Sequence, residues 1–535
     1  MLYLLIVGPI VAGVLTLLFK EKDTRLLTIL IQLALLFYAL HIFIDVRLNG
    51  TLFNYMSHVP EGLAITLMAD AISTVFVLMT STLFLVMMIY AYHKVYFTTT
   101  FGFLFLVLQA LITGLFLSTD LFNLYVLLEV STVTVSILIM INKEKQAIYD
   151  GMIYFFVNVI GTAFLLFGIG MLYRTTGLLE MNAIAEVLPL VEDSRSLFLA
   201  FAFMMTTLSL KTAVVPLFSW LPKAHGTPSA PPVVSAILSG LYIKTGVYLF
   251  IRFSTMFSAA IAIQELFLVI GFATSIFGFV MALGQNDIKM ILAYSTVSQI
   301  GLIMIGLTMG AEKAYWGSLF HIFSHAIFKS TLFLAAGTVY HYYGTRDIRQ
   351  IRGVLKAMPL VGAAILFGVL GVTGAPFFNG SISKYMIAYG SKDPLIQFGL
   401  NLINLGTITY FLKFSTILFG KDERAEEEKP PKEDKLSEIL LLVMGLFIFI
   451  SGVFGPLSVD WIFGYETEIF TAGYFEKGLV YLLMLLAGTG LYNGVIKESG
   501  VLDDISHLEL TFNAIITAMT GNFIFIIGYL YWVFY

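Results

Sequence analysis

Long apolar runs recur along the whole chain, and short polar stretches separate them. Most runs are close to the roughly 20 residues that an α-helix needs to cross a bilayer. The pattern predicts an all-α polytopic membrane protein with sixteen spans. The spans are expected near residues 1–19, 25–45, 63–92, 102–118, 121–142, 149–173, 197–222, 229–252, 263–283, 289–309, 314–341, 356–389, 394–419, 437–455, 474–496 and 506–534.

Three other segments carry a specific expectation. The first run lacks the positively charged start and the cleavage site of a signal peptide, so we expect it to remain as a span. Residues 175–196, between the sixth and seventh spans, are expected to include a short interfacial helix. Residues 421–436 carry closely spaced charges of both signs, which predicts a solvated cytoplasmic linker.

The composition agrees with a membrane protein and excludes some chemistry. Of the 535 residues, 59% are hydrophobic and 12% are charged, more apolar surface than a soluble protein of this length can bury. The chain has no cysteine, which excludes disulfides, cysteine-ligated iron–sulfur clusters and thiol chemistry within it. We expect no cofactor in this chain, so any redox cofactor would lie on another protein of the same complex. No nucleic-acid partner is expected.

The basic residues predict how the chain is oriented. Connections after odd-numbered spans hold eighteen of the thirty lysines and arginines, and connections after even-numbered spans hold seven. Because positively charged loops stay in the cytoplasm, both termini are expected on the outer side of the cell membrane.

The five remaining basic residues all lie inside predicted spans, and all are lysines. They are Lys211, Lys244, Lys329, Lys384 and Lys413. A lysine in hydrocarbon costs about 2.5–3.5 kcal/mol on insertion scales. Unlike arginine, a desolvated lysine can release its proton near neutral pH. A set of buried lysines without a buried arginine therefore indicates groups that gain and lose protons.

Glu129, in the fifth predicted span, is the acid placed most firmly inside the membrane. One interpretation is a counter-ion that only makes a buried lysine tolerable. We favour a second interpretation, in which the charge of Glu129 controls whether a nearby lysine keeps its proton.

The eleventh predicted span carries His321, His325 and Lys329 at intervals of four residues, which places them along one face of a helix. Because histidine changes charge near neutral pH, we favour a proton relay along this face. Hydrogen bonding to a neighbouring helix and zinc binding by the histidine pair are the alternatives. No metal site is predicted, because the acid of H-E-x-x-H and a third ligand are missing.

The tenth predicted span begins with a polar cluster. Its members are Ser295, Thr296, Ser298 and Gln299. Such side chains can bridge water or bond to the backbone of a broken neighbouring helix. Taken alone, they are more typical of helix–helix contacts.

Pro216 in the seventh predicted span and Pro376 in the twelfth each lie near the middle of an unusually long hydrophobic segment. Proline removes a helix hydrogen bond, so both helices are expected to break, close to Lys211 and Lys384. The two segments are five spans apart, and an odd number of spans reverses direction across the membrane. We therefore predict two inverted five-helix repeats, spans four to eight and spans nine to thirteen. Paired broken helices of this kind indicate a transport site.

The predicted repeats divide the chain into five parts. These parts are three N-terminal helices (1–100), a first repeat (101–255), a second repeat (256–420), the charged linker (421–436) and C-terminal helices (437–535).

Three stretches, in this order, resemble a known family: "LKTAVVPLFSWLPKAHGTPSAPPVVSAILSGLYIKTGVYLFIR", "DIKMILAYSTVSQIG" and "HAIFKSTLFLAAG". They resemble the antiporter-like membrane subunits shared by respiratory complex I, Mrp cation/proton antiporters and membrane-bound hydrogenases. The resemblance covers about residues 60–420, and "WLPK" is most similar to the D-type protein of Mrp antiporters. It implies a core of fourteen helices with two inverted repeats. The last two predicted spans lie outside this core.

The resemblance also implies a role for each buried charge. Glu129 would pair with Lys211, Lys244 would be the central relay lysine, His321, His325 and Lys329 would continue the polar axis, and Lys384 would be the exit-side lysine. No role is implied for Lys413, which we expect to extend toward the cytoplasmic edge. Some relatives carry an acid in the sixth span, where this chain has only Asn158 and Thr162 as clear polar residues.

These observations predict a proton- or sodium/proton-translocating subunit of a multi-subunit membrane complex. The expected partners are other membrane subunits and, where the complex is redox-driven, a redox module, and these partners supply the driving energy. A non-conducting structural subunit of such a complex is the main alternative. A self-sufficient transporter of an organic solute is a further one. No catalytic residue is expected, because the aqueous loops contain no nucleotide loop, metal-ligand set or nucleophile–base motif.

Overall fold

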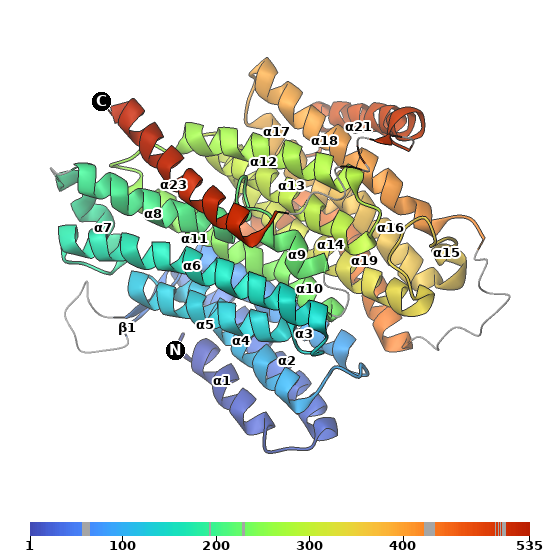
Figure 1. Ribbon diagram of the computed structural model, residues 1–535, viewed down its shortest axis with the longest axis horizontal. Helices are drawn as coiled ribbons and strands as arrows, with labels where there is room; N and C mark the ends of the chain where they lie inside the picture. Colours follow the sequence, from blue (N-terminus) through green and yellow to red (C-terminus); the bar gives the residue numbers. More distant parts are fainter. Residues whose placement is uncertain are drawn as a thin grey trace. The chain divides into compact units, whose positions relative to one another are not determined.

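The computed structural model describes residues 1–55, 65–191, 194–226, 230–421, 434–497, 499–500, 502, 504 and 510–534. Within these ranges, 13 helices are long and apolar enough to cross a membrane, and Figure 1 shows them coloured along the chain. This confirms an all-α, multi-pass membrane protein. The chain forms two compact units. Unit 1 comprises residues 1–230, 242–263 and 510–535, and unit 2 comprises residues 231–241 and 264–509.

Unit 1 holds the first part of the chain together with its last helix. Its elements are α1 (Leu4–Thr16), α2 (Glu21–Asn49), β1 (Leu52–Tyr55), β2 (Thr66–Ala69), α3 (Ala71–Ala91), α4 (Thr99–Leu117), α5 (Leu121–Ile139), α6 (Lys145–Thr176), α7 (Met181–Val187), a 3-10 turn (Leu188–Leu190), α8 (Ser194–Lys211), α9 (Trp220–Gly226), α11 (Ile243–Phe257) and α23 (Phe512–Phe534).

Unit 2 holds most of the second part of the chain. Its elements are α10 (Pro232–Ile237), α12 (Gln264–Gly284), α13 (Ile288–Thr308), α14 (Glu312–Tyr343), α15 (Val354–Ala357), α16 (Pro359–Thr373), α17 (Asn379–Tyr389), α18 (Pro394–Ser415), a 3-10 turn (Thr416–Leu418), α19 (Lys435–Val453), α20 (Gly455–Phe463), α21 (Ala472–Leu491) and a π-helical turn (Tyr492–Ile496).

Each of the sixteen predicted spans has a helical counterpart, although several differ from one continuous membrane-length helix. The first is the short helix α1, and the seventh and twelfth are the interrupted pairs α8–α9 and α16–α17. The short helix predicted between the sixth and seventh spans is α7, and its interfacial position stays a prediction. The predicted cytoplasmic linker falls mostly on residues 422–433, which lie outside the described residues.

The third predicted span begins later than the hydrophobic pattern indicated. Its first residues form β2, which pairs antiparallel with β1 in a small hairpin, and the helix α3 begins only at Ala71. Asp70 fixes this start, because its carboxylate accepts hydrogen bonds from the backbone N–H groups of Ile72 and Ser73 at 3.1 and 2.8 Å. A short apolar strand next to a span cannot be told from helix by hydrophobicity alone.

A helix pair recurs with the same backbone connections in the two units. In unit 1, the N–H of Leu121 at the start of α5 donates to the carbonyl of Leu179 after α6, and in unit 2 Ile288 at the start of α13 donates to Arg346 after α14, both at 2.9 Å. The helices α6 and α14 both have 32 residues and end at a left-handed glycine, Gly177 or Gly344. The corresponding residues are separated by 167 positions in the sequence. Leu121, Gly177 and Leu179 of unit 1 correspond to Ile288, Gly344 and Arg346 of unit 2.

The last two predicted spans pack against helices of this same chain. α21 packs on α18 within unit 2, and α23 packs on α6 and α8 within unit 1. The ring of Phe523 in α23 lies 5.8 Å from that of Phe164 and 4.4 Å from that of Phe203. Figure 1 shows α23 alongside α8.

Candidate ion-translocation site

The first helix interruption lies directly after Lys211, the last residue of α8. The chain leaves the helix through Ala213, which has a positive φ of 52°, and contains Pro216 before helix resumes at Trp220. The indole N–H of Trp220 donates to the Leu210 carbonyl at 2.7 Å. The same carbonyl also accepts from the N–H of Ala213 at 2.9 Å, so it is fully bonded inside the protein at the break, as a membrane interior requires.

Lys211 is almost completely buried, with 2% of its surface exposed. Its ammonium donates to the hydroxyl of Thr132 in α5 at 2.9 Å and to the side-chain oxygen of Asn158 in α6 at 3.1 Å. Both partners are neutral oxygens. No carboxylate lies within 4.0 Å of this ammonium among the described residues.

Glu129 therefore connects to Lys211 indirectly. Its carboxylate accepts a hydrogen bond from the hydroxyl of Thr162 in α6. Thr162 lies one helical turn after Asn158 and also donates to the Asn158 carbonyl at 3.0 Å. The family resemblance implies that Glu129 pairs with Lys211. In this structure, Thr162 and Asn158 of α6 connect the two side chains by hydrogen bonds.

Lys244 is fully buried in the first turn of α11. The turn before it, Leu238–Tyr242, is a π-helix, a local irregularity that is frequent at functional sites. Gly246, two residues after Lys244, allows α11 to approach the end of α8, since a Cβ at Gly246 would lie 2.8 Å from the Lys211 carbonyl carbon. Sequence reasoning did not predict the π-helical turn, which has no recognised residue signal.

In unit 2, His321 of α14 bonds to two neighbouring helices. One ring nitrogen lies 2.8 Å from the Ser383 hydroxyl of α17, and the other lies 3.1 Å from the side-chain oxygen of Gln299 in α13. The ring centroids of His321 and His325 are 6.3 Å apart. The polar stripe of α14 and the polar face of α13 therefore meet within this unit.

Lys329 continues this contact between α14 and α13. Its ammonium donates to the Ser295 hydroxyl and, at 2.9 Å, to the Leu292 carbonyl. Ser298 has a different contact, because its carbonyl accepts from Ser275 of α12 at 2.9 Å. That contact is of the helix–helix type.

Lys413 lies at the end of α18 and bonds away from these groups. Its ammonium donates to the Leu283 carbonyl, in the last turn of α12, at 2.7 Å. A cation at a helix C-terminus is stabilised by the helix dipole.

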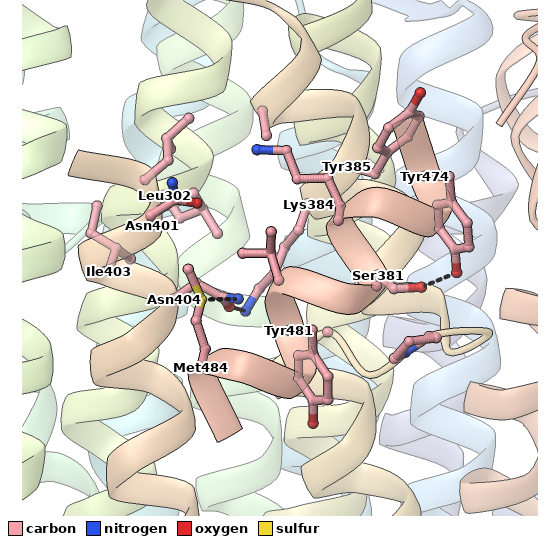
Figure 2. Close-up of a pocket in the computed structure, with 17 residues that line it drawn as sticks. Leu302, Ser381, Lys384, Tyr385, Asn401, Ile403, Asn404, Tyr474, Tyr481 and Met484 are labelled. Atoms are coloured by element: carbon pink, nitrogen blue, oxygen red, sulfur yellow. Dashed lines mark hydrogen bonds between the residues drawn. The ribbon is translucent and has the colours of Figure 1, made fainter. Parts of the chain in front are cut away.

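The second interruption separates α16 from α17 and contains Pro376. α16 ends at Gly374, whose φ of 82° is left-handed and suits glycine. Lys384 follows in α17, and its ammonium donates to the Asn404 side-chain oxygen at 2.8 Å and to the Thr373 carbonyl at 3.3 Å. Figure 2 shows Lys384 beside Asn404 in a cavity of about 80 Å³.

Two ion pairs hold helix ends in place, and their carboxylates lie directly before α3 and α13. Burial raises the pKa of the Asp70 carboxyl, but the bidentate pair with Arg252, at 2.7 and 2.8 Å, outweighs burial and holds that pKa below its usual value. In unit 2, Arg346 lies 2.9 Å from Asp287. Burial outweighs this pair and raises the pKa of Asp287.

The structure thus groups the predicted residues into two sets. Glu129, Lys211, Pro216 and Lys244 lie in unit 1, and the remaining predicted site residues lie in unit 2. Sequence reasoning did not assign a role to the neutral partners. These are Thr132, Asn158, Thr162, Ser383, Thr373 and Asn404. Asn158 and Thr162 stood out as polar residues of an apolar span, and the others are too common in membrane helices to stand out.

The fold and the buried charges define a polytopic helical membrane protein whose interrupted spans carry lysines. The family model described as NADH:quinone oxidoreductase/Mrp antiporter, TM matches residues 118–407, which is more than half of the chain. The chain belongs to this family.

Relatives with established names come from both branches of the family. The chain is 27% identical over 464 residues to the D protein of the Na(+)/H(+) antiporter of Alkalihalophilus pseudofirmus, covering 84% of this chain and 93% of that protein. It is 32% identical over 376 residues to the N protein of the NADH-quinone oxidoreductase of Desulforudis audaxviator, covering 67% of this chain and 74% of that protein.

Solved structures share the fold. A chain of the membrane-bound sulfane sulfur reductase, an archaeal respiratory membrane complex, superposes with a TM-score of 0.80 at 23% identity, covering 91% of this chain and 99% of that chain. A chain of the Mrp complex from a Dietzia species superposes with a TM-score of 0.78 at 23% identity, covering 94% and 99%.

Proposed function

We propose that this chain is the proton- or sodium/proton-translocating subunit of a multi-subunit membrane complex. The observation that carries the proposal is that each interrupted span holds a lysine bonded to neutral oxygens. These are Lys211, buried at the end of α8, and Lys384, half-buried in α17. A scaffold gains nothing from the insertion cost of such lysines. Paired broken helices are also a feature of transport sites.

The charge of Glu129 is the proposed control on Lys211. An ionised Glu129 stabilises the ammonium of Lys211 by Coulomb attraction, and Thr162 and Asn158 hold the two groups in a fixed relation. When the carboxylate is protonated or moves away, Lys211 loses that stabilisation and releases its proton. Each tenfold change in proton affinity corresponds to about 1.4 kcal/mol, so a modest electrostatic change is enough to switch the site.

The proposed path for the proton leads from Lys211 to Lys244, along the polar stripe of α14 formed by His321, His325 and Lys329, and to Lys384. Gln299, Ser295 and Ser383 support this path by their bonds to the histidine and lysine side chains. Transient water would bridge the gaps between these groups.

The proposed complex supplies the driving energy through its other subunits. The relatives include proteins of a Na(+)/H(+) antiporter and of a NADH-quinone oxidoreductase, so the drive is either an opposing ion gradient or electron transfer in a partner. Identification of the subunits that co-purify with a tagged chain decides between them. From the distribution of lysine and arginine, the complex lies in the cell membrane with both termini of this chain outside.

The proposal is tested by ion movement in the assembled complex. The complex is purified through a tag on this chain, reconstituted in liposomes, and driven by a sodium gradient or by its own electron donor. Lys211→Ala and Glu129→Ala are each expected to lower the initial rate of proton movement at least tenfold without loss of subunits. Lys392→Ala, at an exposed position between α17 and α18, serves as the control. Full proton movement by an assembled Lys211→Ala complex would favour the non-conducting structural subunit instead.

A further inference from the structure

The helix α21 lies outside the part of the chain that the family model matches, yet it forms one wall of the Lys384 cavity. α21 packs along α18 in unit 2. Its residues Tyr474, Lys477, Tyr481 and Met484 line the cavity together with residues of α17 and α18. Figure 2 shows Tyr474, Tyr481 and Met484 around Lys384.

Three side chains of α21 bond to the groups that surround Lys384. The Tyr481 hydroxyl lies 3.1 Å from the hydroxyl of Thr373, whose carbonyl accepts from Lys384. Met484 sulfur accepts from the Asn404 amide at 3.6 Å. The Tyr474 hydroxyl accepts from the N–H of Phe377, inside the helix interruption, at 2.9 Å. α21 therefore holds both the interruption and the oxygen partners of Lys384.

Lys477 lies further along the same cavity. Its ammonium donates to the side-chain oxygen of Gln397 in α18 at 3.0 Å, and the Gln397 amide donates to the Ser391 carbonyl, in the connection before α18, at 2.7 Å. Gln397 lies seven residues before Asn404, which is about 10 Å along a helix. The cavity therefore extends from Asn404, the hydrogen-bond partner of Lys384, to Lys477, which bonds near the N-terminal end of α18.

The cavity is large enough for water and has polar groups within a mostly apolar lining. Its volume is about 80 Å³, and one buried water needs roughly 10–15 Å³ of such volume, so several water molecules fit. Hydroxyl and amide groups line it, and its lining residues include two lysines and no carboxylate. The two lysine amines are the charged groups among the lining residues, so they are the candidates to carry a proton through this cavity.

We propose that Lys477 is a further proton-carrying residue and that α21 forms the outlet of the Lys384 site. Lys477 first releases a proton from its ammonium to the aqueous phase. An N–H bond of the Lys384 ammonium then breaks, and water in the cavity takes that proton and passes one of its own to the neutral Lys477 amine, which becomes an ammonium again. Tyr474, Tyr481 and Met484 are positioning residues. The inference rests on the proposed function, since it describes how a translocated proton leaves.

The absence of cysteine from this chain makes a direct test possible. Lys477→Cys is prepared in the assembled complex and reacted with 2-aminoethyl methanethiosulfonate, which restores an amine at this position. A parallel sample receives the trimethylammonium analogue, which restores a positive charge that cannot release a proton. Lys392→Cys, treated in the same way, is the control for an exposed lysine nearby.

The expected result is a rate of proton movement at least fivefold lower for Lys477→Cys, with more than half of the wild-type rate regained after the aminoethyl reagent and no gain after the trimethylammonium reagent. Three results would each overturn the proposed outlet. They are a wild-type rate in unmodified Lys477→Cys, equal recovery with both reagents, and failure of either reagent to label the variant. The last result would show that water does not reach this position. Failure of the proposed function is separate, because it would appear as unchanged proton movement in the Lys211→Ala complex.

Discussion

At the scale of single residues, Thr162 connects the membrane acid to the rest of the site. Its hydroxyl donates to Glu129, and Asn158, one turn earlier in α6, accepts from Lys211. The sequence allowed Glu129 and Lys211 to be chosen, because a charge in an apolar span is conspicuous. It could not show that neutral residues would join them, because hydroxyl and amide groups occur in most membrane helices.

Thr162→Val removes this hydroxyl and keeps the shape of the side chain. Interhelical hydrogen bonds in membranes are worth about 0.6 kcal/mol on average, so the free energy of unfolding should change little. Proton movement should fall severalfold, because Glu129 is no longer held in a fixed relation to Asn158 and Lys211. The measurement is the initial rate in liposomes together with thermal unfolding of the same sample.

Thr206→Val is the matched control for this prediction. Thr206 is buried in α8, and within the described part of the chain its hydroxyl bonds to its own helix alone, at the Ala202 carbonyl. Its substitution is expected to leave the rate unchanged. Equal rates for the Thr162 and Thr206 variants would refute the role given to Thr162.

At the scale of elements, the prolines located both helix interruptions correctly. Pro216 and Pro376 each lie inside the non-helical stretch between two helices. The β1–β2 hairpin and the π-helical turn before Lys244 were missed. Both are set by packing against other elements rather than by a local residue signal, so hydrophobic periodicity does not reveal them.

Gly246 tests whether close approach of α11 to the end of α8 matters. A Cβ there would lie 2.8 Å from the Lys211 carbonyl carbon and 2.9 Å from the Thr212 nitrogen, so Gly246→Ala must push backbone apart. Overpacking of this kind costs about 1–3 kcal/mol, and the shift of Lys211 should also lower proton movement. The midpoint of thermal unfolding in detergent measures the first effect.

Gly170→Ala in α6 provides the comparison, because nothing lies within 4 Å of a Cβ at that position. Alanine favours helix over glycine by about 1 kcal/mol, so this variant should unfold at the same or a higher temperature. If Gly246→Ala unfolds no earlier than Gly170→Ala, then the close packing of α11 is not a constraint.

At the scale of the whole molecule, the recurring helix pair supports the predicted repeat. Adding 167 to Tyr154, Asn158 and Thr162 of α6 gives His321, His325 and Lys329 of α14. The same three positions of this helix thus carry a tyrosine, an asparagine and a threonine in unit 1, and two histidines and a lysine in unit 2. Inversion of the repeats across the membrane stays a prediction.

The sequence also indicated that the last two spans exceed the family core, but not where they pack. The structure places α21 on the Lys384 cavity and α23 on α6 and α8. The sequence of such an apolar helix does not indicate which helix it packs against, because lipid and protein neighbours are equally apolar.

The central claim is that Lys211 releases and regains a proton, and Lys211→Arg tests it most directly. Arginine keeps a positive charge and hydrogen-bond donors for Thr132 and Asn158 but cannot be deprotonated in a protein. The account predicts that the complex assembles with this variant and moves protons at least tenfold more slowly than the wild type in liposomes. Proton movement at the wild-type rate would contradict the account.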